Sequence, residues 1–138
     1  MSQFQFQTVA QIISGIGSIQ QLATILTEQH HQKILLVTDP GMIQHQLHLP
    51  VIEIFNQVGV DHVIYSDVQA DPPEHIVLSA VEFAKAHQVD AVIGFGGGSS
   101  LDVAKIIAIL ADPAQTQTIH MLYGINQAKA PRLPLILI

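Results

Sequence analysis

The part of the sequence best suited to chemistry is a glycine run followed by two serines, Gly96 to Ser100. It lies between an apolar stretch typical of a strand and a periodic stretch typical of a helix. Glycines have no side chains to keep a phosphate away from the backbone N–H groups, and a helix N-terminus favours its negative charge. Ser99 and Ser100 add hydroxyl donors. We therefore expect Gly97 and Gly98 to hold a nucleotide phosphate.

The alternative is a tight turn with a capped helix, because Ser99 and Asp102 have the spacing of a capping box. One glycine is enough for such a turn, and glycine destabilises ordinary structure, so three in a row favour phosphate binding. The run matches neither of the common phosphate loops. Ser99 stands where the dinucleotide fingerprint has its third glycine, and the Gly-Lys-Ser/Thr of a P-loop does not follow.

A second candidate is Asp39, which directly follows the apolar run Lys33–Thr38. Since the carboxyl ends of parallel strands meet at one edge of a sheet, Asp39 can share a crevice with Gly97 and Gly98. Its carboxylate could there accept hydrogen bonds from both ribose hydroxyls of an adenosine. A role as a turn residue before Pro40 explains Asp39 equally well.

These residues must be positioned by alternating strands and helices. Apolar runs predict strands at 33–38, 63–65, 90–95 and 133–138, and a short strand at Phe4–Val9. Periodicity and capping signals predict four helices. One begins at Ser18, one covers 50–58, one begins at Asp71-Pro72, and one covers 101–111. We therefore predict an α/β, Rossmann-like fold. Its mostly parallel sheet would carry helices on both faces and follow a short N-terminal β segment.

Composition excludes several classes of protein. Of the 138 residues, 49% are apolar and 12% charged, which excludes a disordered chain. The apolar stretches are too short to cross a membrane and the first residues resemble no secretion signal, so we expect a cytoplasmic protein without a membrane partner. The net charge of −6 argues against nucleic acid as a partner, and the absence of cysteine excludes disulfides and thiol catalysis.

The eight histidines are not spaced as metal ligands. The HExxH pattern is absent, and the histidines do not cluster with aspartate, whereas a catalytic metal needs about three convergent ligands. We expect each histidine to be a surface or turn residue and Lys105 to be a solvated helix lysine. The sequence therefore predicts no metal ligand and no catalytic residue within the chain.

The segment from Gly96 to Lys105, GGGSSLDVAK, is very similar to the signature of the iron-containing (metal-dependent, group III) alcohol dehydrogenases. Val37-Thr38-Asp39 resembles that family's first nucleotide-binding strand, and Ser14–Ser18 resembles its early strand-to-helix turn. Asp71-Pro72 stands where the family has a proline-containing turn, often with Asn before the proline. The resemblance runs along the whole chain in order and spacing.

The resemblance implies that residues 1–138 are an N-terminal NAD-binding domain. The cofactor-binding residues that it implies are Asp39, Asp71, Gly97, Gly98, Ser99, Ser100 and Asp102. The pyrophosphate would lie on the glycine turn, and the adenine ribose would lie against Asp39. An acid at that position implies NAD rather than NADP, because its charge would repel a 2′-phosphate.

The resemblance also implies a helical domain that this sequence does not contain. In the family, one Asp and three His of that domain hold iron or zinc, which favours the alkoxide from which a hydride passes to the nicotinamide. We expect a chain cut short of its natural end, inactive alone, that forms a homodimer or a larger assembly. It would be the NAD-binding portion of an enzyme acting on a small alcohol or aldehyde. The alternative is a non-catalytic module for nucleotide binding or oligomerisation.

Overall fold

The computed structural model describes residues 8–138, which form one parallel sheet with helices around it. The strands are β1 (Lys33–Val37), β2 (Asp61–Tyr65), β3 (Ala91–Gly94) and β4 (Leu135–Leu137). Their order across the sheet is β2-β1-β3-β4, and the three pairings between neighbours are all parallel. The predicted α/β fold with a mostly parallel sheet is therefore confirmed.

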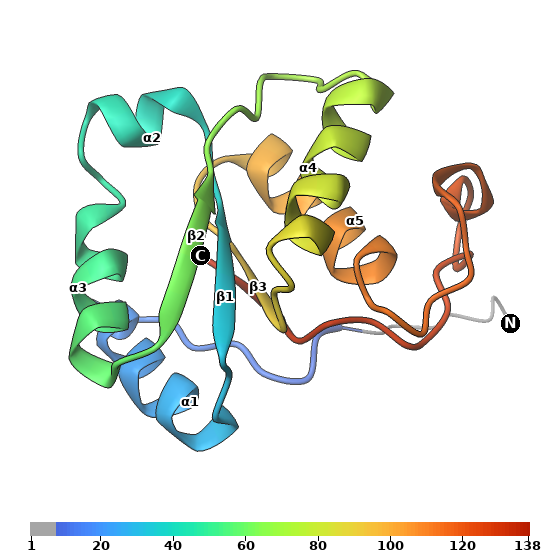
Figure 1. Ribbon diagram of the computed structural model, residues 1–138. Coiled ribbons are helices and arrows are strands. Elements are labelled where there is room, and N and C mark those ends of the chain that lie inside the picture. The colour runs from blue at the N-terminus through green and yellow to red at the C-terminus, as the bar shows by residue number, and fades with distance from the viewer. Residues whose placement is uncertain (1–7) are drawn as a thin grey trace, which may run out of the picture.

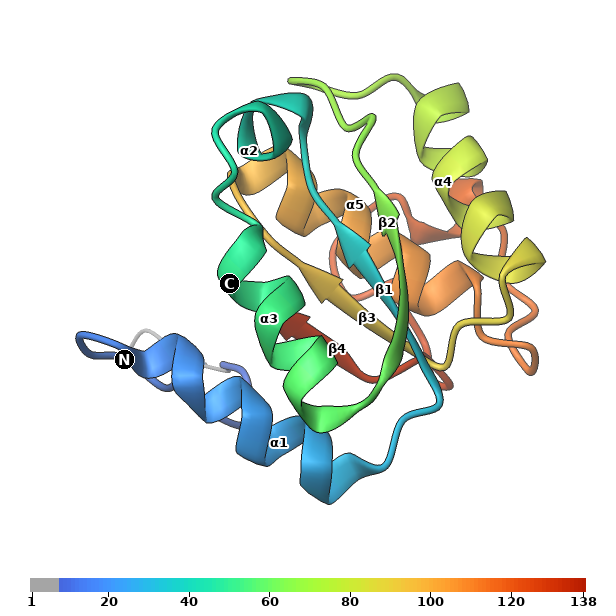
Figure 2. The same cartoon turned by 60° about the vertical axis from the view of Figure 1, so that its left-hand side comes forward.

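Helices cover both faces of this sheet, as predicted. They are η1 (Ser18–Gln20), α1 (Gln21–Gln29), α2 (Pro40–Gln44), α3 (Leu49–Val58), α4 (Glu74–Ala86), α5 (Gly98–Leu110) and η2 (Ile119–Leu122). One face packs against α1 and α3, and the other packs against α4 and α5 (Figure 1, Figure 2). In the described part of the chain, each helix is too short or too polar to pass through a membrane.

Strand β1 lies inside the sheet, between β2 and β3, and its side chains alternate between the two cores. Ile34 and Leu36 pack in the core that α1 and α3 cover, whereas Leu35 and Val37 pack in the core under α4 and α5. All four side chains are fully buried. Burial on both faces explains why this run of the sequence is continuously apolar.

After β2, the next strand is added on the opposite side of β1, although all strands remain parallel. The chain passes from β1 through α3 to β2 on one side of β1, and then through α4 to β3 on the other side. The connections that leave β1 and β3 therefore run to opposite faces. Where the strand order reverses in this way, the carboxyl ends of the two strands open a crevice in which ligands of α/β proteins bind.

At two of the predicted helix starts, the expected capping is not formed. Gly17, with φ 76, is the N-cap of η1, and the capping bond expected from Ser18 is not formed. Helix α4 begins at Glu74 with Pro73 as its N-cap, whereas Asp71 has a left-handed φ of 46 and does not cap the helix. The reason is that Pro72 itself precedes Pro73 and is therefore disfavoured in the helical conformation, so the helix cannot begin at Pro72.

The ends of the chain also differ in part from expectation. Most of the predicted strand Phe4–Val9 falls on residues 1–7, which lie outside the described residues, and Thr8 and Val9 are not in a strand. At the other end, the strand expected over 133–138 is shorter and forms β4. The helix expected over 50–58 is confirmed as α3, which ends at Gly59 with φ 73.

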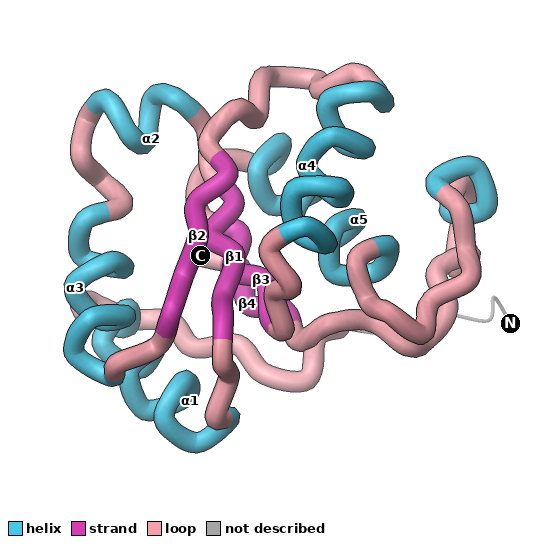
Figure 3. Tube along the Cα trace, viewed as in Figure 1, coloured by secondary structure: helices cyan, strands magenta, loops and turns pink. Residues whose placement is uncertain are grey.

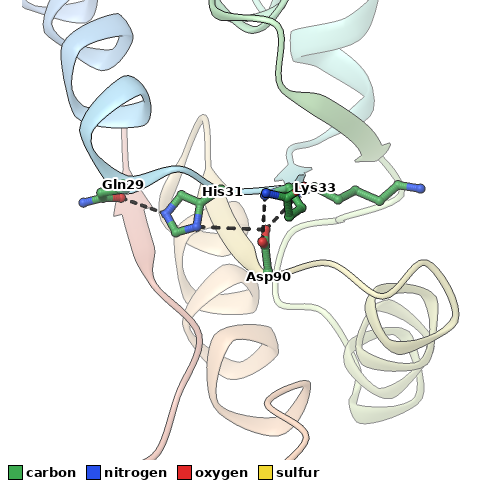
Figure 4. A network of polar contacts seen from close by, with 5 residues as sticks. Gln29, His31, Lys33 and Asp90 are labelled. Atoms are coloured by element: carbon green, nitrogen blue, oxygen red, sulfur yellow. Dashed lines mark hydrogen bonds and ion pairs between the residues drawn. The ribbon is translucent and has the colours of Figure 1, made fainter.

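At the amino edge of the sheet, Asp90 joins the start of β1 to the start of β3 (Figure 4). Its Oδ2 accepts the N–H of Gln32 at 2.7 Å, and its Oδ1 accepts the N–H of Lys33 at 3.0 Å. His31 Nδ1 lies 3.9 Å from Asp90 Oδ1, and His31 Nε2 lies 2.9 Å from Gln29 Oε1. These bonds fix the register of β1 on β3, and so the relative positions of their carboxyl ends.

The long connection between α5 and β4 is irregular except for η2 (Figure 3). Gln115 Nε2 donates to the carbonyl oxygens of Lys129 and Pro131, both at 2.8 Å. Gln117 Nε2 donates to the carbonyl oxygen of Gln127, also at 2.8 Å. The two glutamine side chains therefore hold together the two halves of this loop before the chain enters β4.

Candidate functional site

A cleft of about 390 Å³ opens at the carboxyl edge of the sheet. The lining residues are Asp39, Pro40, Val68, Gln69, Ala70, Gly97, Gly98, Ser99 and Ser100. They come from the segments that follow β1, β2 and β3. The cleft therefore lies where the sheet topology predicts a ligand site, and it brings Asp39 together with the glycine run as the sequence predicted.

A second hollow, of about 590 Å³, lies between α1 and α3, away from the strand ends. The lining residues are Ala23, Thr24, Thr27 and Glu28 of α1 and Gln57 and Val58 at the end of α3. Glu28 contributes a carboxylate, and the lining includes neither lysine nor arginine to bind an anion. This hollow is therefore unsuited to a phosphate, and the cleft at the strand ends is the better candidate site.

Two glycines near the end of β3 are required by the fold itself. A Cβ on Gly94 would lie 2.8 Å from Ala104 Cβ, so the glycine allows α5 to pack closely on β3. Gly96 has φ +128, and a Cβ there would lie 3.1 Å from Asp39 Oδ2. Both positions therefore need glycine with or without a ligand.

Gly97 and Gly98 have neither constraint. Their φ values are not in the left-handed region, and a Cβ at either position would meet no atom within 4 Å. Packing and backbone conformation therefore do not explain why side chains are missing here. The open space beside both residues belongs to the cleft, which fits the close approach of a ligand to the backbone.

Helix α5 begins in the cleft, earlier than the predicted start at Leu101. Gly97 is the N-cap, and Ser99 lies inside the helix, so the alternative interpretation of Ser99 and Asp102 as a capping box is wrong. The N–H groups in the first turn of a helix have no acceptor within the helix. An anion in the cleft would therefore meet free donors and the positive end of the helix dipole.

Asp39 holds two neighbouring elements together at the edge of the cleft. Its Oδ1 accepts the N–H of Met42 at 3.1 Å and so caps α2. Its Oδ2 lies 3.5 Å from Ser100 Oγ in the first turn of α5. The structure thus supports the turn role of Asp39 and also brings its carboxylate into the cleft, where it is the one charged side chain among the lining residues.

Thr38, which precedes Asp39, is a polar residue within the core. Its backbone N–H donates to Tyr65 O at 2.9 Å. The side chain is fully buried, and Oγ1 finds no hydrogen-bond partner among residues 8–138. A buried hydroxyl without a partner is destabilising.

Two of the predicted binding residues do not line the cleft. Asp71 is exposed and follows Ala70, which is a lining residue. Asp102 points to the exposed side of α5, where its Oδ1 accepts from Lys105 Nζ at 2.9 Å. Lys105 is thus an exposed helix lysine in an ion pair.

Sequence reasoning missed Pro40 and the segment 68–70, which follows β2. The rule that parallel strands end at one edge also applies to β2, so it could have placed this segment at the cleft. The side chains of Val68, Gln69 and Ala70 carry no charge that would have drawn attention to them.

The described residues offer no place for a metal ion. Over residues 8–138, no three His, Cys, Asp or Glu side chains gather closely enough to hold one. The cleft combines backbone donors, hydroxyls and one carboxylate, which is a set suited to binding a phosphorylated ligand.

Comparisons with known proteins identify relatives along nearly the whole chain. A family model described as iron-containing alcohol dehydrogenase matches residues 10–138. Sulfoacetaldehyde reductase from Bilophila wadsworthia (strain 3_1_6) is 33% identical over 135 residues, which are 98% of this chain and 34% of the reductase. NAD-dependent methanol dehydrogenase from Bacillus methanolicus is 31% identical over 126 residues, which are 91% of this chain and 32% of that enzyme.

Solved structures agree in fold. NADH-dependent butanol dehydrogenase A from Thermotoga maritima matches with a TM-score of 0.83 and 28% identity, over 99% of this chain and 34% of the other. The chain spans about a third of the length of these relatives.

Proposed function

The chain belongs to the iron-containing alcohol dehydrogenase family, and we propose from this premise that it forms the NAD-binding portion of such an enzyme. The observation that carries the proposal is the cleft, in which the glycine run, the start of α5 and Asp39 come together. Two of the similar proteins are named for their use of NAD or NADH, which supports the choice of cofactor. When bound, NAD supplies a nicotinamide that exchanges a hydride with an alcohol or aldehyde.

The N–H groups at the start of α5 bind the pyrophosphate in this proposal. Gly97 and Gly98 leave room for it, and Ser99 is half-buried at the cleft with its hydroxyl available as a further donor. Asp39 accepts hydrogen bonds from the adenine ribose and repels a 2′-phosphate, so NAD is preferred over NADP.

Asp71 and Asp102, the two predicted binding residues outside the cleft lining, have a smaller role in binding the nucleotide. Asp71 adjoins the lining through Ala70, and Asp102 lies in the second turn of α5, beyond the lining residues 98–100. We place both at the rim of the cleft, where they approach only those parts of the nucleotide that extend beyond it.

The described residues do not form a site for the metal. We propose that in the complete protein the iron or zinc and the small alcohol or aldehyde are bound by residues other than these. We also propose that the enzyme is cytoplasmic and forms a homodimer or a larger assembly.

The test has two measurements. Calorimetric titration of the protein with NAD should show binding, and Gly97→Val should remove it. Formation of NADH from NAD and an alcohol by the complete protein would then support the enzyme. Nucleotide binding without any such turnover would favour a non-catalytic binding module, and the absence of NAD binding would refute the proposal.

A further inference from the structure

Ser100 differs from the other polar residues of the cleft because its side chain is buried. The residue is 1% exposed, although it belongs to the first turn of a helix that begins at the cleft. Its Oγ lies 3.5 Å from Asp39 Oδ2, and no other side-chain hydrogen bond of Ser100 is present among the described residues. A buried hydroxyl is costly when it loses its partner, so the serine is expected to keep this bond.

The bond from Ser100 completes a two-point hold on the carboxylate of Asp39. Met42, at the start of α2, donates its N–H to Oδ1, and Ser100, at the start of α5, donates its hydroxyl to Oδ2. With one contact to each oxygen, the pair favours one orientation of the carboxylate plane. An ionised carboxylate has about four acceptor positions, so about two remain for a ligand.

We propose that Ser100 is a positioning residue for nucleotide selection, acting through Asp39. Its hydroxyl holds the Asp39 carboxylate in the orientation that accepts the ribose hydroxyls of NAD and opposes the 2′-phosphate of NADP. This inference rests on the proposed function of the cleft. It gives the two neighbouring serines different tasks, because Ser99 is half-buried at the cleft whereas Ser100 is enclosed.

The first test compares the dissociation constants of NAD and NADP for the complete protein and for Ser100→Ala. We expect the preference for NAD to fall about threefold to tenfold, because the bond is to a charged acceptor but is long. Ser100→Thr retains a hydroxyl and should restore most of the preference. Ser79→Ala is the matched control, since Ser79 lies on the exposed side of α4 and donates to His75 O; it should leave the preference unchanged.

The second test asks whether Ser100 acts through Asp39. In an Asp39→Ala background, Ser100→Ala should no longer change the preference, because the carboxylate to be oriented is gone. Circular dichroism should show the same folded spectrum for all variants. A change of equal size in both backgrounds would show direct contact with the nucleotide and overturn the inference.

An unchanged preference in Ser100→Ala would overturn it as well. Both results leave NAD binding by the unaltered protein intact. They are therefore distinct from failure of the proposed function, in which the unaltered protein does not bind NAD.

Discussion

Asp39 combines a structural bond with a proposed binding role, and substitution can separate the two. Asp39→Gly should reduce the preference for NAD over NADP roughly tenfold or more, which corresponds to at least about 1.4 kcal/mol. The physical reason is that the variant loses both the ribose acceptor and the charge that opposes a 2′-phosphate. Calorimetric titration of the two nucleotides measures the preference directly.

Asp39→Asn is the matched variant. Its amide oxygen can still accept the N–H of Met42 at the start of α2, but its charge is gone. Asparagine and glycine are both tolerated at N-caps, with a loss of only a few tenths of a kcal/mol for glycine. An NAD preference that is the same in both variants and in the unaltered protein would contradict the role of Asp39.

Thr38, which follows β1 and precedes Asp39, allows a test of how a buried hydroxyl affects the stability of the fold. Thr38→Val keeps the branched shape and removes a hydroxyl that has no partner among the described residues. We expect the free energy of unfolding to stay the same or to rise by up to about 1 kcal/mol. Urea denaturation measures it. A clear fall in stability would show instead that the hydroxyl is hydrogen-bonded, for example to a buried water molecule.

Among the elements, the start of α5 distinguishes glycines that serve the fold from glycines that serve the ligand. Gly97→Val should abolish NAD binding and leave the sheet folded, because a Cβ at this position meets no protein atom within 4 Å. The branched side chain would instead occupy the space that a phosphate needs. Calorimetry on the folded variant checks this, and unchanged affinity would place the phosphate elsewhere.

Gly94→Ala is the contrasting substitution on the same strand-to-helix connection. Its Cβ would lie 2.8 Å from Ala104 Cβ and 2.9 Å from Leu137 Cδ2, so α5 and β4 would have to shift. We expect a loss of about 1–3 kcal/mol in the free energy of unfolding, as is usual for overpacked cores.

The order of the elements could be predicted from the sequence because strands and helices carry strong local signals. Continuous apolar runs identified β1 and β3, and Gly59 identified the end of α3. The short helix α2 was missed, since Asp39-Pro40-Gly41 suits a turn as well as a capped helix with proline in its first turn. The start of α5 was placed too late because Gly98 to Ser100 was interpreted as a loop.

The site could be predicted only in part, for a different reason. Asp39 and the glycine run stand at strand ends and carry recognisable chemistry, so their meeting followed from the parallel sheet. The bond between Asp39 and Ser100 joins residues 61 positions apart. It depends on where the first turn of α5 begins, which local patterns do not determine.

At the scale of the whole molecule, apolar side chains remain exposed at several places. Before α1, Val9, Ile12 and Ile16 are 62%, 73% and 110% exposed, respectively. Within residues 8–138, β4 pairs only with β3 and has no strand on its outer edge. We therefore predict that the 138 residues alone self-associate. Light scattering checks this, and a clean 15.0 kDa monomer at tens of micromolar would contradict it.

The same 138 residues should show no alcohol oxidation by themselves, even with NAD and added iron or zinc. The reason is that residues 8–138 contain no cluster of three ligating side chains for the metal. Formation of NADH above the rate of the buffer would reveal an active site within these residues. The activity of the complete protein under the same conditions is the positive control.

The strand order also has a consequence for the newly made chain as it leaves the ribosome. Among residues 8–138, β1 is the first strand to emerge, yet its partners are distant, and the Asp90 that closes its start on β3 lies 57 positions after Lys33. At about 5–20 residues per second, that interval takes roughly 3–11 s. When Asp90 has been translated, α5, one of the two helices that cover Leu35 and Val37, has still to be made. The apolar side chains of β1 therefore stay incompletely covered in the nascent chain until both β3 and α5 have been translated.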